Sequence, residues 1–359
     1  MKKIISIAVT VFSIATLFLA VSCHDPIFYM ISQEVVQEEG LQGDIYSMVR
    51  FGDYLYASNG RIYKKTASPS STTGRQNGQW SESSRSGIGS NEFVFFLATD
   101  NSNIYAQTYE FAADNDKSLN LPAAIRLYAS NNGSTWTQIN IFSITDYGSA
   151  SDSYATQGGR IFDNKAVNAS ERHAYASLLK NGETTPKIFT LNGTNTPTHN
   201  SSASGDSLGA AGDYFWTTAA ICKANNGKYY FSHNSKTLYY GNSISATDHV
   251  DLDCDDIQSI AATSDYLLLG TTKGIKRVRL GADGVPESHT TDFANNAQSL
   301  VTGIVPMVFV LDPTKPEGQT DEYASMTVAG SLSSSADTFE ENGLYAYYPS
   351  RGVWNRDGE

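Results

Sequence analysis

The residues with the clearest potential for chemistry lie in one acidic segment, 249–256, which reads His-Val-Asp-Leu-Asp-Cys-Asp-Asp. Polar and apolar residues alternate there, so a strand would place His249, Asp251, Asp253 and Asp255 on one face. Three carboxylates beside a histidine are a candidate site for a divalent cation, since such ions take several oxygen ligands. Same-face neighbours in a strand, however, lie about 6 to 7 Å apart, too far for all of them to reach one ion. The favoured interpretation is an outer edge strand whose charges discourage pairing with another sheet.

The other reactive residue types give no prediction of a catalytic site. The HExxH spacing is absent, and the serine-rich segments 151–154 and 201–207 are predicted to be solvated loops. We therefore predict no catalytic residue and no cofactor, and no metal beyond the weak candidates above. Four further histidines are scattered along the chain: His173, His199, His233 and His289.

Two cysteines of the predicted mature chain, Cys222 and Cys254, can be interpreted in two ways. In an oxidising compartment they could form one disulfide, which would act as a local staple in so long a chain. The alternative is a pair of buried free thiols. The sequence leaves both interpretations open.

The amino-terminus has the pattern of a secretory signal. Lys2 and Lys3 precede a long apolar stretch, which ends in Ala-Val-Ser directly before Cys23. This ending resembles that of bacterial lipoproteins, and the alanine three residues before the cysteine resembles the looser box of spirochaete lipoproteins. The resemblance implies that residues 1–22 are removed and that Cys23 carries the lipid. An ordinary secretory signal and an uncleaved anchor helix are the alternatives.

Composition restricts the class of protein further. The 359-residue chain has 25 Lys and Arg against 37 Asp and Glu, a formal net charge of -12. A nucleic-acid partner is excluded, because a phosphate-binding face needs clustered basic residues. The 29 glycines, 21 tyrosines and 16 phenylalanines favour many short strands and turns. No stretch after the signal approaches the roughly 20 apolar residues of a membrane-spanning helix.

A pattern of short strands recurs along the chain, with an apolar strand, a Tyr-rich strand, a tight turn and a third strand. Gly and Trp follow some of the copies. The copies are about 54 residues apart, which is the size of a propeller blade. They begin near residues 45, 93, 173, 214, 257 and 304.

This repeat predicts an all-β chain folded as a β-propeller of about six four-stranded blades. One blade cannot bury both apolar faces alone, whereas radial packing of blades buries both. The most apolar segments, 93–97 and 304–310, are predicted to be innermost strands. Seven blades remain possible if residues 146–168 contain another unit, and a pair of β-sandwiches is the other alternative.

One turn strengthens the propeller prediction. Residues 129–136 resemble the Asp-box (BNR-like) hairpin of sialidase-like and sortilin-like propellers, with Ala for Ser at the start and Asn131 for Asp. The resemblance implies an outer hairpin in which Asn131 closes the turn, Gly133 takes positive φ, Thr135 completes the motif and Trp136 packs between strands. It implies no activity, and the arginine cluster that a sialidase needs is missing.

These observations predict three segments: a signal peptide at 1–22, a lipidated tether and first strand at 23–43, and one propeller at 44–359. We expect the chain in the bacterial cell envelope, anchored to a membrane through Cys23 and either periplasmic or surface-exposed. The expected role is a binding or protein-interaction scaffold for a protein or glycan ligand. A glycan hydrolase or lyase is the alternative, and it would need carboxylates converging at the central channel. A purely structural envelope component is the third possibility.

Overall fold

A computed structural model of the chain divides it into two compact units, one of Met1–Glu39 with Gly358–Glu359 and one of Gly40–Asp357. All residues that the structure describes belong to the second unit. They are residues 41, 43, 45–69, 76–77, 79–110, 124–139, 160–166, 168–178, 187–204, 220–233, 235–293, 307–315, 321–326, 343–349 and 352–357.

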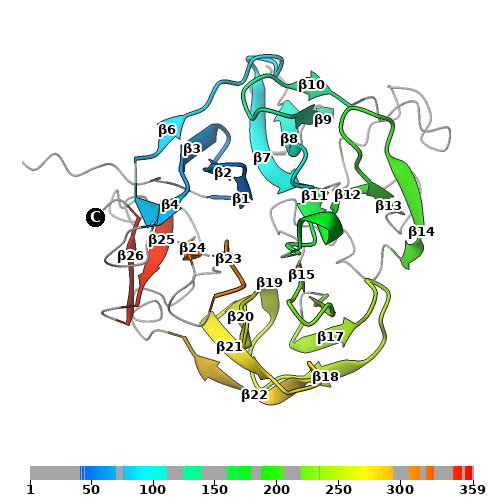
Figure 1. The fold of residues 1–359 in the computed structure, drawn as a ribbon, viewed down its shortest axis with the longest axis vertical. Helices are drawn as coiled ribbons and strands as arrows, with labels where there is room; N and C mark the ends of the chain where they lie inside the picture. Colours follow the sequence, from blue (N-terminus) through cyan, green and yellow to red (C-terminus); the bar gives the residue numbers. More distant parts are fainter. Residues whose placement is uncertain are drawn as a thin grey trace, which may run out of the picture. The chain divides into compact units, whose positions relative to one another are not determined.

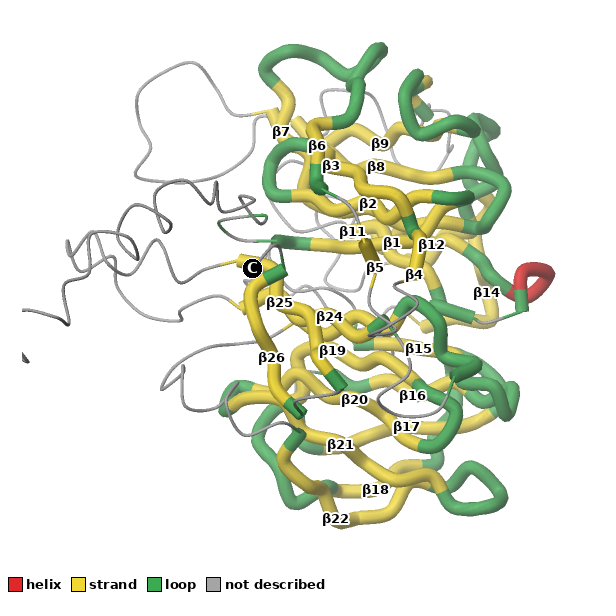
Figure 2. The backbone as a smooth tube through the Cα atoms, turned by 60° about the vertical axis from the view of Figure 1, so that its left-hand side comes forward, coloured by secondary structure: helices red, strands yellow, loops and turns green. Residues whose placement is uncertain are grey.

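The second unit is a ring of six four-stranded antiparallel sheets, a six-bladed β-propeller (Figure 1). The innermost strands, β1, β7, β11, β15, β19 and β23, surround the centre of the ring. The strands within each blade run side by side when the ring is turned (Figure 2). The predicted fold class is confirmed, with six blades rather than seven.

Blades 1 to 3 contain the first twelve blade strands. Blade 1 has β1 (Ser47–Phe51), β2 (Tyr54–Ser58), β3 (Ile62–Thr66) and β6 (Ser81–Glu82). Blade 2 has β7 (Glu92–Thr99), β8 (Ile104–Glu110), β9 (Ala124–Ser130) and β10 (Thr137–Gln138). Blade 3 has β11 (Arg160–Asp163), β12 (Ala174–Leu178), β13 (Lys187–Thr190) and β14 (Thr198–Ser204), with the short 3-10 helix η4 (Ala169–Glu171) between β11 and β12.

Blades 4 to 6 repeat the arrangement. Blade 4 has β15 (Ile221–Lys223), β16 (Tyr229–Phe231), β17 (Thr237–Gly241) and β18 (His249–Asp251). Blade 5 has β19 (Ile257–Ala262), β20 (Tyr266–Thr271), β21 (Gly274–Leu280) and β22 (Pro286–Asp292). Blade 6 has β23 (Met307–Val310), β24 (Glu322–Met326), β25 (Gly343–Tyr348) and β26 (Val353–Arg356), and a separate two-stranded sheet joins β4 (Ser68–Pro69) to β5 (Gln76–Asn77).

One predicted blade start is wrong, and a second lies outside the described residues. The strand expected to begin blade 3 near His173 is its second strand, and the innermost strand is β11, which lies within the stretch suspected of hiding a seventh blade. In blade 4 the innermost strand is β15, whereas the predicted start at residues 214–216 lies outside the described residues. Residues 201–204, predicted as part of a solvated loop, belong to strand β14. The other predicted loop, 151–154, lies outside the described residues.

The apolar core is divided among the seams between blades. Six buried clusters each combine side chains from two neighbouring blades. At the seam between blades 2 and 3, for example, Phe96 and Tyr105 pack in one cluster with Ile161 and Phe189. Each blade therefore depends on both neighbours for the burial of its faces, which is the physical reason for a closed ring.

Ring closure depends on contacts between blades 1 and 6, because each blade is built from strands that follow one another along the chain. The backbone N–H of Leu344 donates to Leu41 O at 3.1 Å. Lys65 Nζ lies 2.9 Å from Asp357 Oδ2, and Trp80 Nε1 donates to the same oxygen at 2.6 Å. The side chains of Lys65 and Asp357 are each 1% exposed. We call Lys65, Trp80 and Asp357 the closure triad.

Candidate binding site at the channel mouth

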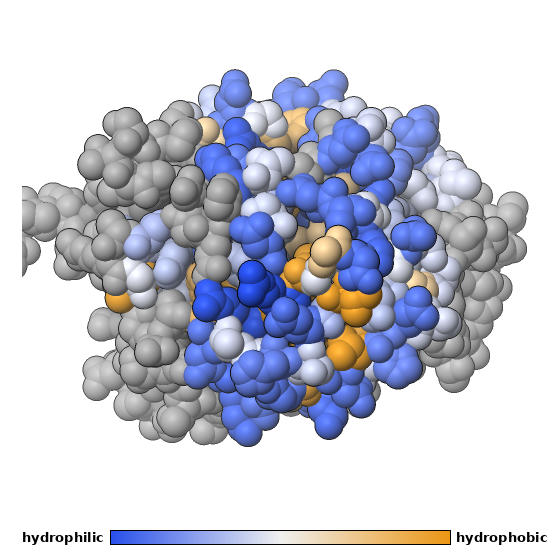
Figure 3. All heavy atoms as spheres, turned by 60° about the horizontal axis from the view of Figure 1, so that its bottom comes forward, coloured by the Kyte–Doolittle hydropathy of each residue, from blue (hydrophilic) through white to orange (hydrophobic). Residues whose placement is uncertain are grey.

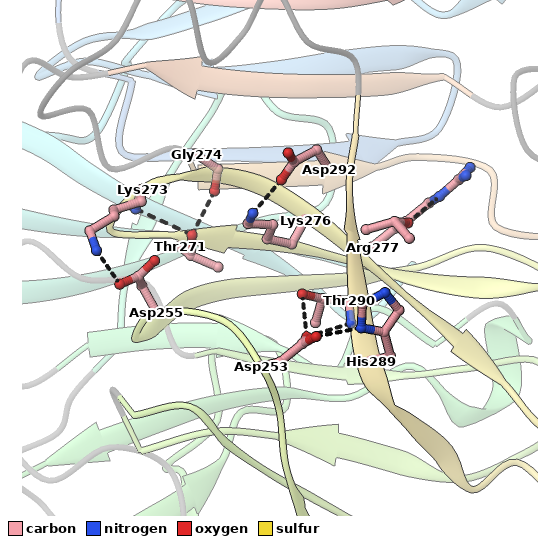
Figure 4. A network of polar contacts seen from close by, with 11 residues as sticks. Asp253, Asp255, Thr271, Lys273, Gly274, Lys276, Arg277, His289, Thr290 and Asp292 are labelled. Atoms are coloured by element: carbon pink, nitrogen blue, oxygen red, sulfur yellow. Dashed lines mark hydrogen bonds and ion pairs between the residues drawn. The ribbon is translucent and has the colours of Figure 1, made fainter.

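The structure does not bring the three predicted metal-binding carboxylates together. Strand β18 ends at Asp251, so the alternating strand predicted to continue to residue 256 is shorter than expected. Asp251 accepts a hydrogen bond from Thr237 Oγ1, Asp253 contacts blade 5 and Asp255 forms an ion pair with Lys273 at 2.8 Å. Figure 4 shows Asp253 and Asp255 turned toward different partners.

The first three residues of the acidic segment form the outer edge strand of blade 4. Strand β18 is the last strand of its sheet, and His249 and Asp251 are exposed. Residues 252–256 lie beyond this strand. No group of three or more potential metal ligands occurs within the described part of the chain.

Asp253 links blade 4 to blade 5. Its Oδ1 accepts from Thr290 N at 2.6 Å and from Thr290 Oγ1 at 2.7 Å, and its Oδ2 contacts His289 Nδ1 (Figure 4). The Thr290 side-chain and backbone donors, followed by His289, hold the pKa of Asp253 below its usual value. The charged form of Asp253 is thus the one that the seam between blades 4 and 5 stabilises.

We expect Asp253 to contribute to stability only when it is ionised. Its pKa is lower in the folded than in the unfolded chain, so its contribution is present above about pH 4 and is lost as the pH falls through the folded pKa. The thermal midpoint of Asp253→Asn should lie below that of the wild type at pH 7, and the gap should narrow toward pH 3. Thermal scans from pH 3 to 7 test this, and a gap that widens in acid would contradict it.

The two cysteines are both free. Cys222 lies in β15 and is buried in the cluster between blades 4 and 5, whereas Cys254 packs partly buried against the edge of that cluster. Burial raises the pKa of Cys222 to about 12 and that of Cys254 to about 11. Both side chains therefore serve as neutral packing groups.

The thiols should accordingly be protected in the folded protein. We expect the denatured mature protein, purified without reductant, to contain both thiols of Cys222 and Cys254 free for alkylation. In the folded protein, Cys222 should react more slowly than Cys254, because it is fully buried. Mass spectrometry after alkylation measures both, and a disulfide-linked peptide pair would overturn the expectation.

The turn that resembles an Asp-box is closed one residue later than predicted. Asn132 Oδ1 accepts from the backbone N–H groups of Ser134 and Thr135, both at 2.9 Å, whereas Asn131 is exposed. Gly133 has the expected positive φ of 68°, and its N–H donates to Ser130 Oγ at 2.9 Å. Trp136 is buried at the seam between blades 1 and 2. The hairpin between β9 and β10 is thus an outer hairpin, as expected.

Asn132→Ala should reduce stability by about 1 to 2 kcal/mol, because it removes both side-chain hydrogen bonds that close the turn. Asn131→Ala is the matched control and should change stability by less than about 0.5 kcal/mol. Urea unfolding of the two variants measures the difference. A larger loss of stability in Asn131→Ala than in Asn132→Ala would show that the side chain of Asn131 closes the turn.

A small cavity of about 30 Å³ lies at the mouth of the central channel, where the innermost strands end. Its walls come from blades 1, 2, 3 and 6. Three of its lining side chains are cationic, namely Arg50, Lys165 and Arg172, and one is anionic, Asp163. The apolar wall consists of Met48, Val49, Phe309, Val310 and Leu311. We call this cavity the axial mouth.

Two of the cations are fixed by the ring itself. Lys165 Nζ donates to Ile260 O of blade 5 at 2.8 Å, so this side chain links blade 3 to blade 5. Arg172 Nε donates to Ala166 O at 2.8 Å and its Nη1 donates to Asn101 Oδ1 at 3.0 Å. Burial lowers the pKa of Lys165. The ammonium and guanidinium groups are thus held in place before any ligand arrives.

The carboxylate at the mouth has a structural role. Asp163 is buried, its Oδ2 accepts from Thr99 N at 3.1 Å and its Oδ1 accepts from Lys165 N at 2.8 Å. Both oxygens therefore tie the ends of β7 and β11 to the mouth. Of the described residues around this cavity, Asp163 supplies the sole carboxylate, so the convergent carboxylates of a glycan hydrolase are not found at this end of the channel.

A larger polar depression of about 590 Å³ begins beside the axial mouth, and Arg172 lines both. It follows the seam between blades 2 and 3, with Asp100 and Ser102 on one side and Thr190 and Asn192 on the other. The mouth and this seam depression thus form adjoining parts of one face.

Sequence reasoning missed the axial mouth completely. Lys165 and Arg172 lie in the connection between β11 and β12, inside or next to the stretch suspected of hiding a blade, and Arg50 lies in strand β1. One local signal existed: Asp163 and Asn164 precede Lys165, and such residues favour turns.

Comparisons with known proteins give no family assignment. No family model and no curated protein matches the chain. Among solved structures, the Myceliophteria thermophila Cps50 (Swd1) β-propeller domain has 10% identity and a TM-score of 0.43, over 89% of this chain and 86% of that one. A Bacteroides fragilis protein described as a putative 6-phosphogluconolactonase has 12% identity and a TM-score of 0.41, over 85% and 80%. PorZ of the Porphyromonas gingivalis type-IX secretion system has 11% identity and a TM-score of 0.42, over 88% and 38%.

The class of protein follows from the blades themselves. Six consecutive four-stranded antiparallel sheets in a ring define a six-bladed β-propeller, and the cationic axial mouth is its best-defined candidate site. The described residues include no helix long and apolar enough to cross a membrane. The predicted signal and Cys23 lie outside the described residues.

Proposed function

We propose that this chain is a lipid-anchored, extracytoplasmic propeller that acts as a binding scaffold in the bacterial cell envelope. The observation that supports binding is the axial mouth, where Arg50, Lys165 and Arg172 face one cavity and the single carboxylate is already engaged by backbone donors. Fixed cations beside an apolar wall suit recognition of a ligand, whereas glycan hydrolysis needs a pair of available carboxylates.

The anchor is the second part of the proposal, and it is supported by the sequence alone. Lys2, Lys3, the apolar stretch and Cys23 have the order of a lipoprotein signal. A single lipid chain binds a membrane only reversibly, so stable anchoring needs more than one acyl chain. The lipid would hold the propeller at a membrane surface outside the cytoplasm.

Binding and catalysis can be separated by two assays on the purified mature protein. One measures retention on a printed array of envelope glycans and of envelope proteins, and the other measures release of reducing ends from the same glycans. We expect saturable retention without turnover. Release of reducing ends that exceeds a heat-denatured control would instead establish the enzyme.

The anchor is tested in bacterial cells grown with an alkyne-labelled palmitate. The wild-type chain should incorporate the label and sediment with membranes, and Cys23→Ala should do neither. Cys254→Ala is the matched control, because it also removes one thiol and leaves the signal intact. Equal labelling of wild type and Cys23→Ala would contradict the anchor without affecting the binding proposal.

A further inference from the structure

We infer that the axial mouth is a binding site for a carboxylate group carried on a short alkyl chain, such as an acidic side chain of a partner peptide. This inference rests on the proposed binding function and names its ligand chemistry. It follows from three features of the mouth: its fixed cations, its apolar wall and its continuity with the seam depression.

Lys165 has a strained backbone conformation at the mouth. Its φ is 47°, in the left-handed region that a lysine seldom adopts. Asn101, which accepts the hydrogen bond of Arg172, has φ of 68°. These two are the non-glycine residues with positive φ in the described part of the chain, and both serve this one site. Asparagine adopts this region readily, so the strain lies at Lys165, and strained residues of this kind cluster at functional sites.

The cationic side chains at the mouth have N–H groups that can donate hydrogen bonds to a ligand. Among the described residues, the hydrogen bond to Ile260 O uses one of the three N–H groups of Lys165 Nζ. The bonds to Ala166 and Asn101 use Nε and Nη1 of Arg172, and Nη2 belongs to neither bond. Arg50 lines the same cavity and is partly buried. The mouth can therefore offer donors from three cations to one anionic group.

The net charge of the side chains at the axial mouth is opposite in sign to that of the whole chain. The whole protein has a formal net charge of -12, yet the mouth has three cations and one carboxylate. Because five of the ten lining residues are apolar, these charges act more strongly on an entering anion than fully exposed charges would. An acidic group is the ligand chemistry that this reversal favours.

The cavity suits a carboxylate better than a bulkier anion. Its volume of about 30 Å³ leaves room for a small group only. One wall is formed by Phe309, Val310 and Leu311, against which methylene groups can pack. The carboxylate group itself matches this volume, and the alkyl stem that carries it would pack against the apolar wall. The adjoining seam depression of about 590 Å³ could hold the polar backbone that follows.

The test is isothermal titration of the mature protein with three probes. Glutarate represents the free carboxylate, a Gly-Glu-Gly peptide acetylated at its amino-terminus and amidated at its carboxyl-terminus represents the side chain in a peptide, and inorganic phosphate is the competing anion. We expect the carboxylate probes to bind more tightly than phosphate and to weaken with added salt. Tighter binding of the peptide than of glutarate would identify a peptide source, and the reverse would identify a free acid.

Two arginine variants test whether the carboxylate binds at the axial mouth. Arg172→Gln and Arg50→Gln should each weaken carboxylate binding about 10-fold or more, because each removes a charge-assisted hydrogen bond. Lys273→Gln, which removes an exposed cation on blade 5, should leave the affinity within about 2-fold. Circular dichroism of each variant verifies the fold, and Arg50→Gln is the safer variant because no described residue depends on its side chain.

Three results would overturn the inference: no binding of either carboxylate probe, tighter binding of phosphate, or unchanged affinity in both arginine variants. Retention of a glycan or protein on the array by an Arg172→Gln, Arg50→Gln double variant would then show that the binding function stands at another site. Loss of all retention in the wild type would instead contradict the proposed function itself.

Discussion

Replacing Asp357 with asparagine is expected to lower the free energy of unfolding by about 3 to 5 kcal/mol, because it removes the carboxylate charge that faces the buried Lys65 ammonium. The two side chains are each 1% exposed, so water cannot substitute for the lost partner. Closure of the ring depends on this contact, since none of the described strands is exchanged between blades 1 and 6. Urea unfolding monitored by tryptophan fluorescence measures the loss.

Two controls isolate the charge effect. Glu82→Gln breaks the exposed ion pair with Arg61 and should cost no more than about 1 kcal/mol. The double variant Lys65→Met, Asp357→Asn removes both charges and keeps an acceptor for Trp80, so it should recover most of the stability lost in Asp357→Asn. If the double variant lost as much unfolding free energy as the two single variants together, packing and not charge would close the ring.

Gly87→Ala is expected to cost about 2 to 5 kcal/mol, through backbone strain and overpacking together. Gly87 lies in the connection between blades 1 and 2 and has φ of 100°. A Cβ there would lie 1.9 Å from the carbonyl oxygen of Trp136, whose N–H donates to Ser86 O at 2.7 Å. The substitution therefore pushes the outer hairpin of blade 2 away from blade 1. Thermal unfolding measures the cost.

Gly227→Ala is the matched control for this position. Its φ is 80°, and a Cβ added there meets nothing within 4 Å. The variant should lose only about 1 to 2 kcal/mol, the cost of left-handed backbone for a residue with a side chain. Equal destabilisation of the two alanine variants would contradict this expectation. It would show that the close approach of Gly87 to Trp136 adds nothing to the cost of the substitution.

Blades with regular strands were predictable from the sequence. In blade 5 the predicted start near residue 257 coincides with the first residue of β19, and alternating apolar residues and tight turns set the register of β19, β20 and β21. Blade 3 was not predictable in the same way. Its innermost strand has only four residues, Arg160–Asp163, and begins with a cation, so it lacks the long apolar run that identifies β7.

The candidate site was beyond sequence reasoning for a physical reason. Propeller sites assemble from loops distant in the chain, and Arg50, Lys165 and Arg172 meet only because blades 1 and 3 converge on the axis. The acidic segment 249–256 attracted attention because its carboxylates are close in sequence. The structure distributes them along an outer edge, where each contacts a different partner.

A crystal structure of the mature protein grown with glutarate tests the axial-mouth site most directly. We expect six blades and one carboxylate in the axial mouth, within hydrogen-bond distance of Lys165 and Arg172 and beside Arg50. A mouth filled by side chains of the protein, with glutarate absent or bound elsewhere, would contradict the assignment of this site.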